Sequence, residues 1–124
     1  LLYVVRCLYS MPPAHGAALV ETILGDNQLK QQWLDELKVM RDRINGNRAI
    51  LVERLKAIGV EQDFSFIARQ KGMFSFLGVL PEQVEQLKQE FGIYMVDSSR
   101  ISIAGISNSN VDYLAKSIAK VLQG

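Results

Sequence analysis

Apolar side chains recur through the middle of the chain at spacings of three, four and seven residues. This pattern covers residues 28–58 and is typical of one face of an α-helix. It predicts one long amphipathic helix, whose other faces carry Arg43, Arg48 and Glu53 among other polar residues. The apolar positions are Leu29, Trp33, Leu37, Met40, Ile44, Leu51, Leu55 and Ile58.

One segment of this predicted helix is a potential break. Asn45-Gly46-Asn47 contains a turn signal, and a glycine in a helix interior costs about 1 kcal/mol relative to alanine. A break there is therefore an open alternative. The apolar spacing resumes in phase after Gly46, which favours one continuous helix.

The chain before this helix opens on an apolar stretch, residues 1–5, which ends ahead of Pro12-Pro13. Helical spacing of apolar residues predicts a short helix over about 17–24, and Gly25-Asp26-Asn27 predicts its end and a new cap. The apolar start without an initiator Met leads us to expect a fragment of a longer protein.

The chain after Gly59 alternates between predicted strands and helices. Phe64, Phe66 and Ala68 alternate with the residues between them, and residues 73–77 follow after Lys71-Gly72, which predicts two strands joined by a tight turn. A helix is predicted over 81–91 because proline suits a first helical position. Further strands are predicted at 93–96 and 100–106, followed by a last helix that Asn108, Ser109 or Asn110 can cap.

This order of elements predicts a protein of the α/β class with a local α+β arrangement. A mostly antiparallel sheet covered by helices on one face satisfies it, with the long helix leading into that layer.

Composition narrows the class of protein. Of the 124 residues 48% are hydrophobic and 22% are charged, the balance of a soluble globular protein. The net charge of +1 argues against a nucleic-acid partner, and no apolar run approaches the roughly 18 residues of a membrane span. The single cysteine, Cys7, is compatible with a reducing cytoplasm.

Few residues can perform chemistry. His15 is the only histidine, so a His-rich metal site is excluded, and its neighbours indicate a turn or capping role. Arg100 stands at the start of an apolar strand, where a guanidinium can present a rigid fork to a carboxylate. The alternative is that Arg100 pairs with Asp97 or points to water. Taken alone, Arg6 is a helix-end arginine, and the side chains of residues 73, 74 and 76 belong to the core.

Ordered motifs then point to a family. Residues 6–17 resemble the R-x-x-Y-S-N-P-P-A-H-G-A stretch of bacterial aspartate and aromatic aminotransferases. Residues 63–67 and 72–78 are similar to that family's D-F-S-F-I and G-M-F-S-F-x-G, and residues 98–105 to its S-G-R-[IV]-N-V-[AS]-G. Residues 82–94 resemble the helix and strand between them. The whole chain thus resembles the C-terminal portion of a class I aminotransferase that uses pyridoxal 5′-phosphate (PLP).

The resemblance implies a role for several residues. Arg100 matches the arginine that binds the substrate α-carboxylate. Arg6 matches the arginine that reaches the neighbouring subunit's active site and binds a side-chain carboxylate. Phe74, Ser10 and Met11 match positions that line the pocket or influence its specificity. The implied enzyme is a homodimer whose small-molecule substrates are amino acids, aspartate or aromatic ones, and 2-oxo acids.

The resemblance also implies a domain organisation. Residues 1–27 would end the large PLP domain, residues 28–58 would form the interdomain helix, and residues 59–124 would form the small C-terminal domain.

Four positions depart from the family pattern. Met11 replaces an asparagine near Arg6, which makes the distal pocket more apolar and favours aromatic or mixed specificity. Ser99 replaces the glycine before Arg100, so a positive φ there would be costly. Ser102 replaces an asparagine, and Gly46 interrupts the long helix. The choice between aspartate, tyrosine and phenylalanine stays open.

The lysine that would hold PLP is missing from this chain. In the family it precedes the point that Leu1 matches, so we expect no catalytic residue, no cofactor-binding residue and no activity in the chain alone. The alternative is a free-standing amino-acid-binding or regulatory α+β module without catalysis. The lysines of the chain are Lys30, Lys38, Lys56, Lys71, Lys88, Lys116 and Lys120, and only Lys120 has a serine, Ser117, at the S-x-x-K spacing.

Overall fold

The computed structural model describes residues 2–8 and 13–123. The chain forms two compact units, Leu1–Met40 and Arg41–Gly124, and the boundary falls inside a long helix. Each unit is described by itself.

The first unit is helical and has no core of its own. It contains α1 (Leu2–Leu8), α2 (His15–Gly25) and the first part of α3 (Asn27–Ile58), and none of its described side chains is buried. The short helix predicted over 17–24 is confirmed, with His15 as its first residue. The predicted cap is confirmed as well, because the Asp26 carboxylate accepts the N–H groups of Gln28 and Leu29 at 2.8 and 3.0 Å.

Helix α3 runs without a break through Asn45, Gly46 and Asn47, so the continuous helix is confirmed. The placement of Arg48 on a solvent-facing side of that helix is wrong. Its side chain is 1% exposed, because the backbone carbonyls of the segment that follows α4 cover this turn of the helix and accept its hydrogen bonds.

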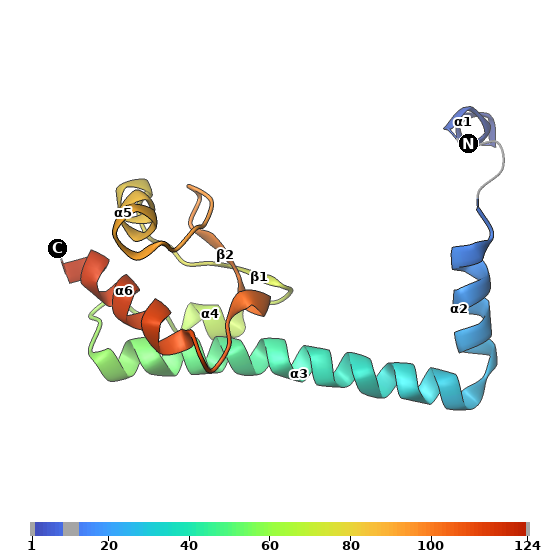
Figure 1. Ribbon diagram of the computed structural model, residues 1–124, viewed down its shortest axis with the longest axis horizontal. Helices are drawn as coiled ribbons and strands as arrows, with labels where there is room; N and C mark the ends of the chain where they lie inside the picture. The colour runs from blue at the N-terminus through green and yellow to red at the C-terminus, as the bar shows by residue number, and fades with distance from the viewer. Residues whose placement is uncertain (1, 9–12, 124) are drawn as a thin grey trace. The chain divides into compact units, whose positions relative to one another are not determined.

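The second unit adds the α-helices α4, α5 and α6, a 3₁₀ helix and a small sheet to the end of α3 (Figure 1). The predicted helix starts and stops are confirmed at Pro81 and at Gly59 and Gly92, whose φ angles of +82° and +62° favour glycine. The elements are α4 (Phe66–Arg69), β1 (Phe74–Phe76), α5 (Pro81–Phe91), β2 (Arg100–Ser102), the 3₁₀ helix η1 (Ile103–Gly105) and α6 (Val111–Gln123).

The sheet is much smaller than predicted. Strands β1 and β2 pair antiparallel, with Phe74 opposite Ser102 and Phe76 opposite Arg100. The antiparallel direction is confirmed, but the expectation of a mostly antiparallel layer is wrong, because the described part of the chain is mostly helical.

Local hydrogen bonds explain one missing strand and one shortened strand. Residues 64–68 were expected to be extended, but the Asp63 carboxylate accepts the Ser65 N–H and hydroxyl at 2.8 Å each, which bends the chain into α4. Strand β2 stops at Ser102 instead of running to residue 106, because the Ile106 N–H turns back to the Ile103 carbonyl at 3.1 Å.

The second missing strand, residues 93–96, has no ladder partner among the described residues. An isolated extended segment cannot form a strand ladder, so this prediction is also wrong for the described chain.

A single hydrophobic cluster holds the second unit together. Helices α5 and α6 pack against each other and, with the end of α3, enclose the buried side of the two strands (Figure 1). The buried apolar side chains of this cluster are Leu51, Leu55, Phe64, Ile67, Leu77, Val79, Val84, Leu87, Ile101, Ile103, Ile106, Val111, Ala115, Ile118 and Val121.

Candidate functional site

The exposed face of the two-stranded sheet holds the main candidate residues. Successive strand residues point to opposite faces, so Phe74, Phe76, Arg100 and Ser102 share one face while the residues between them are buried. Phe74 is 49% exposed and Phe76 54% exposed. The core placement of these aromatics and of Met73, which is 56% exposed, is therefore wrong.

Arg100 lies over an aromatic ring on this face. Its Cζ atom is 4.8 Å from the centroid of the Phe74 ring, a cation–π contact worth about 0.5–1 kcal/mol at an exposed site. The two residues are diagonal neighbours in the register, because Arg100 is opposite Phe76. The contact places the guanidinium over the ring, and the Arg100 side chain remains exposed to solvent.

No acidic side chain occupies the Arg100 guanidinium. None of the ion pairs within residues 2–8 and 13–123 includes Arg100, so the alternative pairing with Asp97 is not observed. The forked N–H groups therefore remain available to a carboxylate, which they can bind with two parallel hydrogen bonds.

Ser99, the residue before Arg100, adopts the positive φ that was expected to be costly for a residue other than glycine. Ser99 has φ +57°, in the left-handed region that disfavours residues with a Cβ. Three hydrogen bonds hold it there. Its N–H donates to Val96 O at 2.8 Å, its carbonyl accepts the Leu77 N–H at 2.9 Å, and its hydroxyl accepts the Gly78 N–H at 3.0 Å. Ser99 is fully buried, so this turn fixes the point from which the Arg100 side chain leaves the backbone.

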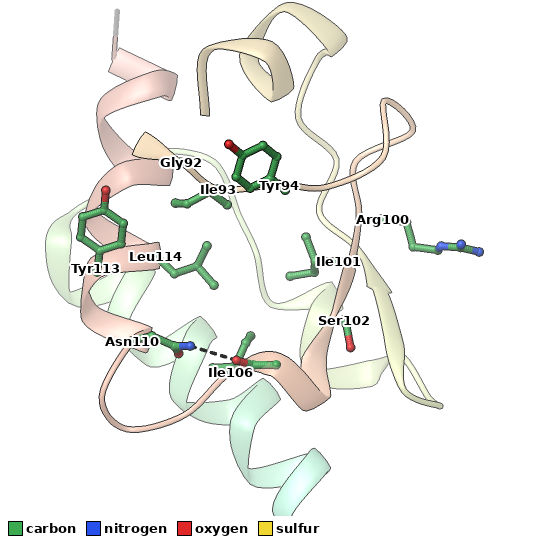
Figure 2. Close-up of a pocket in the computed structure, with 11 residues that line it drawn as sticks. Gly92, Ile93, Tyr94, Arg100, Ile101, Ser102, Ile106, Asn110, Tyr113 and Leu114 are labelled. Carbon is green, nitrogen blue, oxygen red and sulfur yellow. Dashed lines mark hydrogen bonds between the residues drawn. The ribbon is translucent and has the colours of Figure 1, made fainter. Parts of the chain in front are cut away.

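A hollow of about 400 Å³ adjoins β2, and Arg100, Ile101 and Ser102 are among the residues that line it. Ile93, Ile101 and Leu114 line it, and Figure 2 shows the Arg100 side chain pointing away from it. Its polar rim is already used within the protein, since Asn110 Nδ2 donates to the Gly105 carbonyl at 2.9 Å and the Tyr113 hydroxyl to the Phe91 carbonyl at 2.8 Å. The exposed face, and not this hollow, is where a charged ligand can meet Arg100.

A second arginine, absent from the sequence-based candidates, supports the site from the buried side. The Arg48 guanidinium donates to the carbonyls of Ile67 at 3.4 Å and Phe74 at 3.1 Å, to the Gly72 carbonyl, and to the Ser75 hydroxyl. Burial lowers the pKa of this guanidinium from its ordinary value, yet arginine remains charged in proteins.

The sequence did contain a signal for Arg48. Residue 48 follows Ile44 by four positions and precedes Leu51 by three, so it lies on the apolar stripe of α3. Asn47 lies on the same stripe and is also buried. A polar residue on the apolar stripe of a helix is expected to be buried, and it then needs hydrogen-bond partners.

The other predicted site residues are not part of the second unit. Arg6 is in the last turn of α1 and exposed, as expected for a helix-end arginine, and it belongs to the first unit. Its role in binding a side-chain carboxylate therefore stays a prediction. Ser10 and Met11 lie outside the described residues.

Comparison with known proteins decides the family. The family pattern described as "Aminotransferase class I and II" matches residues 1–118. The chain belongs to this family. It is 55% identical over 119 residues to an aspartate aminotransferase of Haemophilus influenzae and 48% identical to one of Pseudomonas aeruginosa, covering 96% of the chain in both cases.

Solved aminotransferase structures share the fold closely. An aromatic-amino-acid aminotransferase from Burkholderia pseudomallei, covalently bound to pyridoxal phosphate, matches 97% of the chain with a TM-score of 0.94 and 50% identity. An aromatic aminotransferase from Psychrobacter sp. B6, cocrystallised with aspartic acid, matches with a TM-score of 0.91 and 45% identity. The chain spans about 30% of the length of these relatives.

The described residues do not fit PLP. That cofactor requires a lysine for its Schiff base and donors for its phosphate. Lys56 lines a hollow of about 390 Å³, but Glu61 and Asp63 share the lining, and their carboxylates repel a phosphate.

Within residues 2–8 and 13–123, no helix has the length and apolar character needed to cross a membrane.

Proposed function

We propose that this chain is part of an aminotransferase that exchanges an amino group between aspartate or an aromatic amino acid and a 2-oxo acid. In this proposal Arg100 binds the substrate α-carboxylate. The observation that supports it is the exposed guanidinium of Arg100, stacked on Phe74 and free of any acidic partner in the described chain. PLP, held by residues outside this chain, supplies the electron sink of the reaction.

The chain would form the C-terminal portion of the enzyme. Residues 1–27 would end the large domain, residues 28–58 would link the domains, and residues 59–124 would form the small domain. Membership of the family and the match to about 30% of each relative support a partial chain, and the ordered motifs support its C-terminal placement. The cytoplasm is the proposed location, although relatives named as mitochondrial also match.

Two arginines would each bind a different carboxylate of the substrate. Arg100 would hold the α-carboxylate that every substrate shares. Arg6 would reach the neighbouring subunit of a homodimer, near Ser10 and Met11, and bind a second carboxylate. A substrate held at both ends has its reacting carbon placed in a fixed position, and moving Arg6 aside would admit an aromatic side chain. Phe74 would line the pocket and keep the Arg100 plane oriented.

The proposal is tested in the complete enzyme by Arg100→Ala. Hydrogen bonds to charged groups contribute about 1.5–3 kcal/mol each, so losing a bidentate pair should lower kcat/KM by about 10² to 10⁴. Arg69→Ala is the matched control, because Arg69 is another exposed arginine of the second unit. Equal kcat/KM values for Arg100→Ala and wild type would refute the role of Arg100.

Calorimetry of the 124-residue chain separates this proposal from a free-standing binding module. Aspartate, glutamate and phenylalanine should give no saturable heat, since one arginine at an exposed face offers two hydrogen bonds and little burial of the ligand. Saturable binding of any of these amino acids in the millimolar range or tighter would favour the module.

A further inference from the structure

We propose that Arg48 is a positioning residue, which fixes β1 from its buried side and thereby sets the direction of the Arg100 guanidinium. The importance of this for substrate binding rests on the proposed function. The geometric part, that Arg48 controls how Phe74 and Arg100 meet, stands on the structure of the second unit alone.

The first support is the set of groups that Arg48 holds. Its two terminal nitrogens reach four acceptors: α4 through Ile67 O, the turn at Gly72, and β1 through Phe74 O and Ser75 Oγ. The carbonyl of Phe74 is thus bound by one arginine while its ring supports another. A shift of Arg48 must therefore move the backbone from which the Phe74 ring projects.

The second support is electrostatic. No ion pair within the described ranges includes Arg48, and its Nε has no hydrogen-bond partner. Burying a charge without a counter-ion is costly, and apolar residues of similar volume often replace buried charges without loss of stability. The four acceptors on one short segment offset this cost only while they stay in place. The arrangement favours one position of β1 over its neighbours.

The third support is that the same helix holds the end of β2. Asn47 Nδ2 donates to Ile103 O at 3.1 Å and to Ile106 O at 2.8 Å, and Arg43 donates to Ala104 O at 3.0 Å. Arg48 therefore locates the strand of Phe74, and its neighbours on α3 locate the chain just after the strand of Arg100. Helix α3 therefore holds the backbone near both members of the cation–π pair, Phe74 and Arg100.

Lysine cannot replace this arginine. The guanidinium is planar and presents five N–H donors in a fixed fork, whereas an ammonium group is a point with three donors. Arg48→Lys keeps the charge but cannot reach Ile67, Gly72, Phe74 and Ser75 together. This makes Arg48→Lys the informative variant, because it separates the fork from the charge.

Proton NMR of the 124-residue chain tests the geometric claim. The Phe74 ring should shift the Arg100 side-chain protons upfield, and Phe74→Leu defines the value without the ring. Arg48→Lys should move these protons most of the way to the Phe74→Leu value. Arg41→Lys is the matched control and should leave them unchanged, because Arg41 lies one heptad earlier on α3 and pairs only with Asp42 at the surface. An unchanged Arg100 shift in Arg48→Lys would overturn the proposal.

A milder variant protects the test against loss of folding. Ser75→Ala removes one acceptor of Arg48 and no apolar contact, so the chain should stay folded and the Arg100 shift should fall part of the way. If Arg48→Lys is unfolded, an unchanged shift in Ser75→Ala would overturn the proposal by itself.

Kinetics of the complete enzyme separate the two claims. Arg48→Lys should raise KM by about tenfold or more with a smaller change in kcat per folded site, because misplacing a binding group by 1 Å costs up to about 100-fold. A merely structural role would lower the amount of folded enzyme and leave KM unchanged. If Arg100→Ala has no effect on kcat/KM, the proposed function fails while the NMR result stands. If Arg48→Lys changes neither the shift nor KM, positioning fails while the function stands.

Discussion

An arginine guanidinium lies at each face of the small sheet, and the surroundings of the two guanidinium groups differ. On the buried face the terminal nitrogens of Arg48 are engaged by carbonyls and a hydroxyl, and this arginine is 1% exposed. On the outer face Arg100 is exposed, contacts an aromatic ring and has no acidic partner in the described chain. A guanidinium whose terminal nitrogens bond to its own protein is a support, and one that contacts only an aromatic ring is available to a ligand.

The largest difference between the faces should appear in stability. Ile101→Ala removes a side chain that is 8% exposed from the buried face and should lower the free energy of unfolding by about 2–5 kcal/mol. Ser102→Ala, one residue later on the outer face, should change it by about 0.5 kcal/mol or less. Chemical denaturation of both variants measures the contrast, and equal losses would mean that the faces are not distinct.

A second contrast concerns the helix that supports β2. Asn47→Ala leaves the carbonyls of Ile103 and Ile106 without their donor and should cost about 1–3 kcal/mol of unfolding free energy. Asn45→Ala is the control, because Asn45 is exposed on the same turn and alanine is the better helix former. If both variants are equally stable, α3 does not hold the end of β2.

A smaller effect is expected at the turn before Arg100. Ser99→Ala keeps a Cβ at positive φ and loses the hydroxyl bond to Gly78, which should cost about 0.5–1.5 kcal/mol. Ser99→Gly loses the same bond but removes the backbone strain, so it should be about 1 kcal/mol more stable than Ser99→Ala. Thermal unfolding of the two variants side by side checks the order, and an alanine variant as stable as the glycine variant would show that Ser99 is unstrained.

The smallest effect is electrostatic. Hydrogen bonds from the Ser65 N–H and hydroxyl lower the pKa of the Asp63 carboxyl, and the coulombic effect of Arg69 acts in the same direction. A carboxyl with a depressed folded pKa adds stability that is present above its unfolded pKa of about 4 and is lost as pH falls through the folded value. Asp63→Asn should therefore be less stable than wild type at neutral pH, and the gap should close below about pH 4. A gap that stays constant between pH 7 and pH 2 would contradict this pKa shift.

Helices were predictable from the sequence because their signals are local and redundant. Pro81 and Gly92 mark the two ends of α5, and the apolar stripe outweighs Gly46 within α3. Strands were less predictable, because a strand needs a hydrogen-bonded partner strand that the alternation of residues does not reveal. Phe64, Phe66 and Ala68 alternate as a strand does, but the Asp63 side chain closes a helical turn there, and residues 93–96 meet no partner strand in the described chain.

The family resemblance named Arg100 and Phe74, whereas Arg48 was not among the candidates, although its position on the apolar stripe of α3 was a signal. Arg100 and Phe74 stand in motifs whose resemblance to a family gave them roles. Arg48 was assigned to a polar face because charged residues are usually solvated, and no rule of spacing says which backbone carbonyls will reach it. Ser99 is an intermediate case. Because it stands where the family has glycine, the sequence indicated that φ could be positive there, and the structure shows that φ is +57°.

The most direct test of the account compares a 2-oxo acid with its 2-oxo amide as inhibitors of the complete enzyme. Wild type should bind the acid far more tightly than the amide, because the amide cannot accept a bidentate charged contact from Arg100. In Arg100→Ala this preference should largely disappear, with the acid losing affinity and the amide changing little. An acid-over-amide preference that survives Arg100→Ala at full size would contradict the claim that Arg100 binds the α-carboxylate.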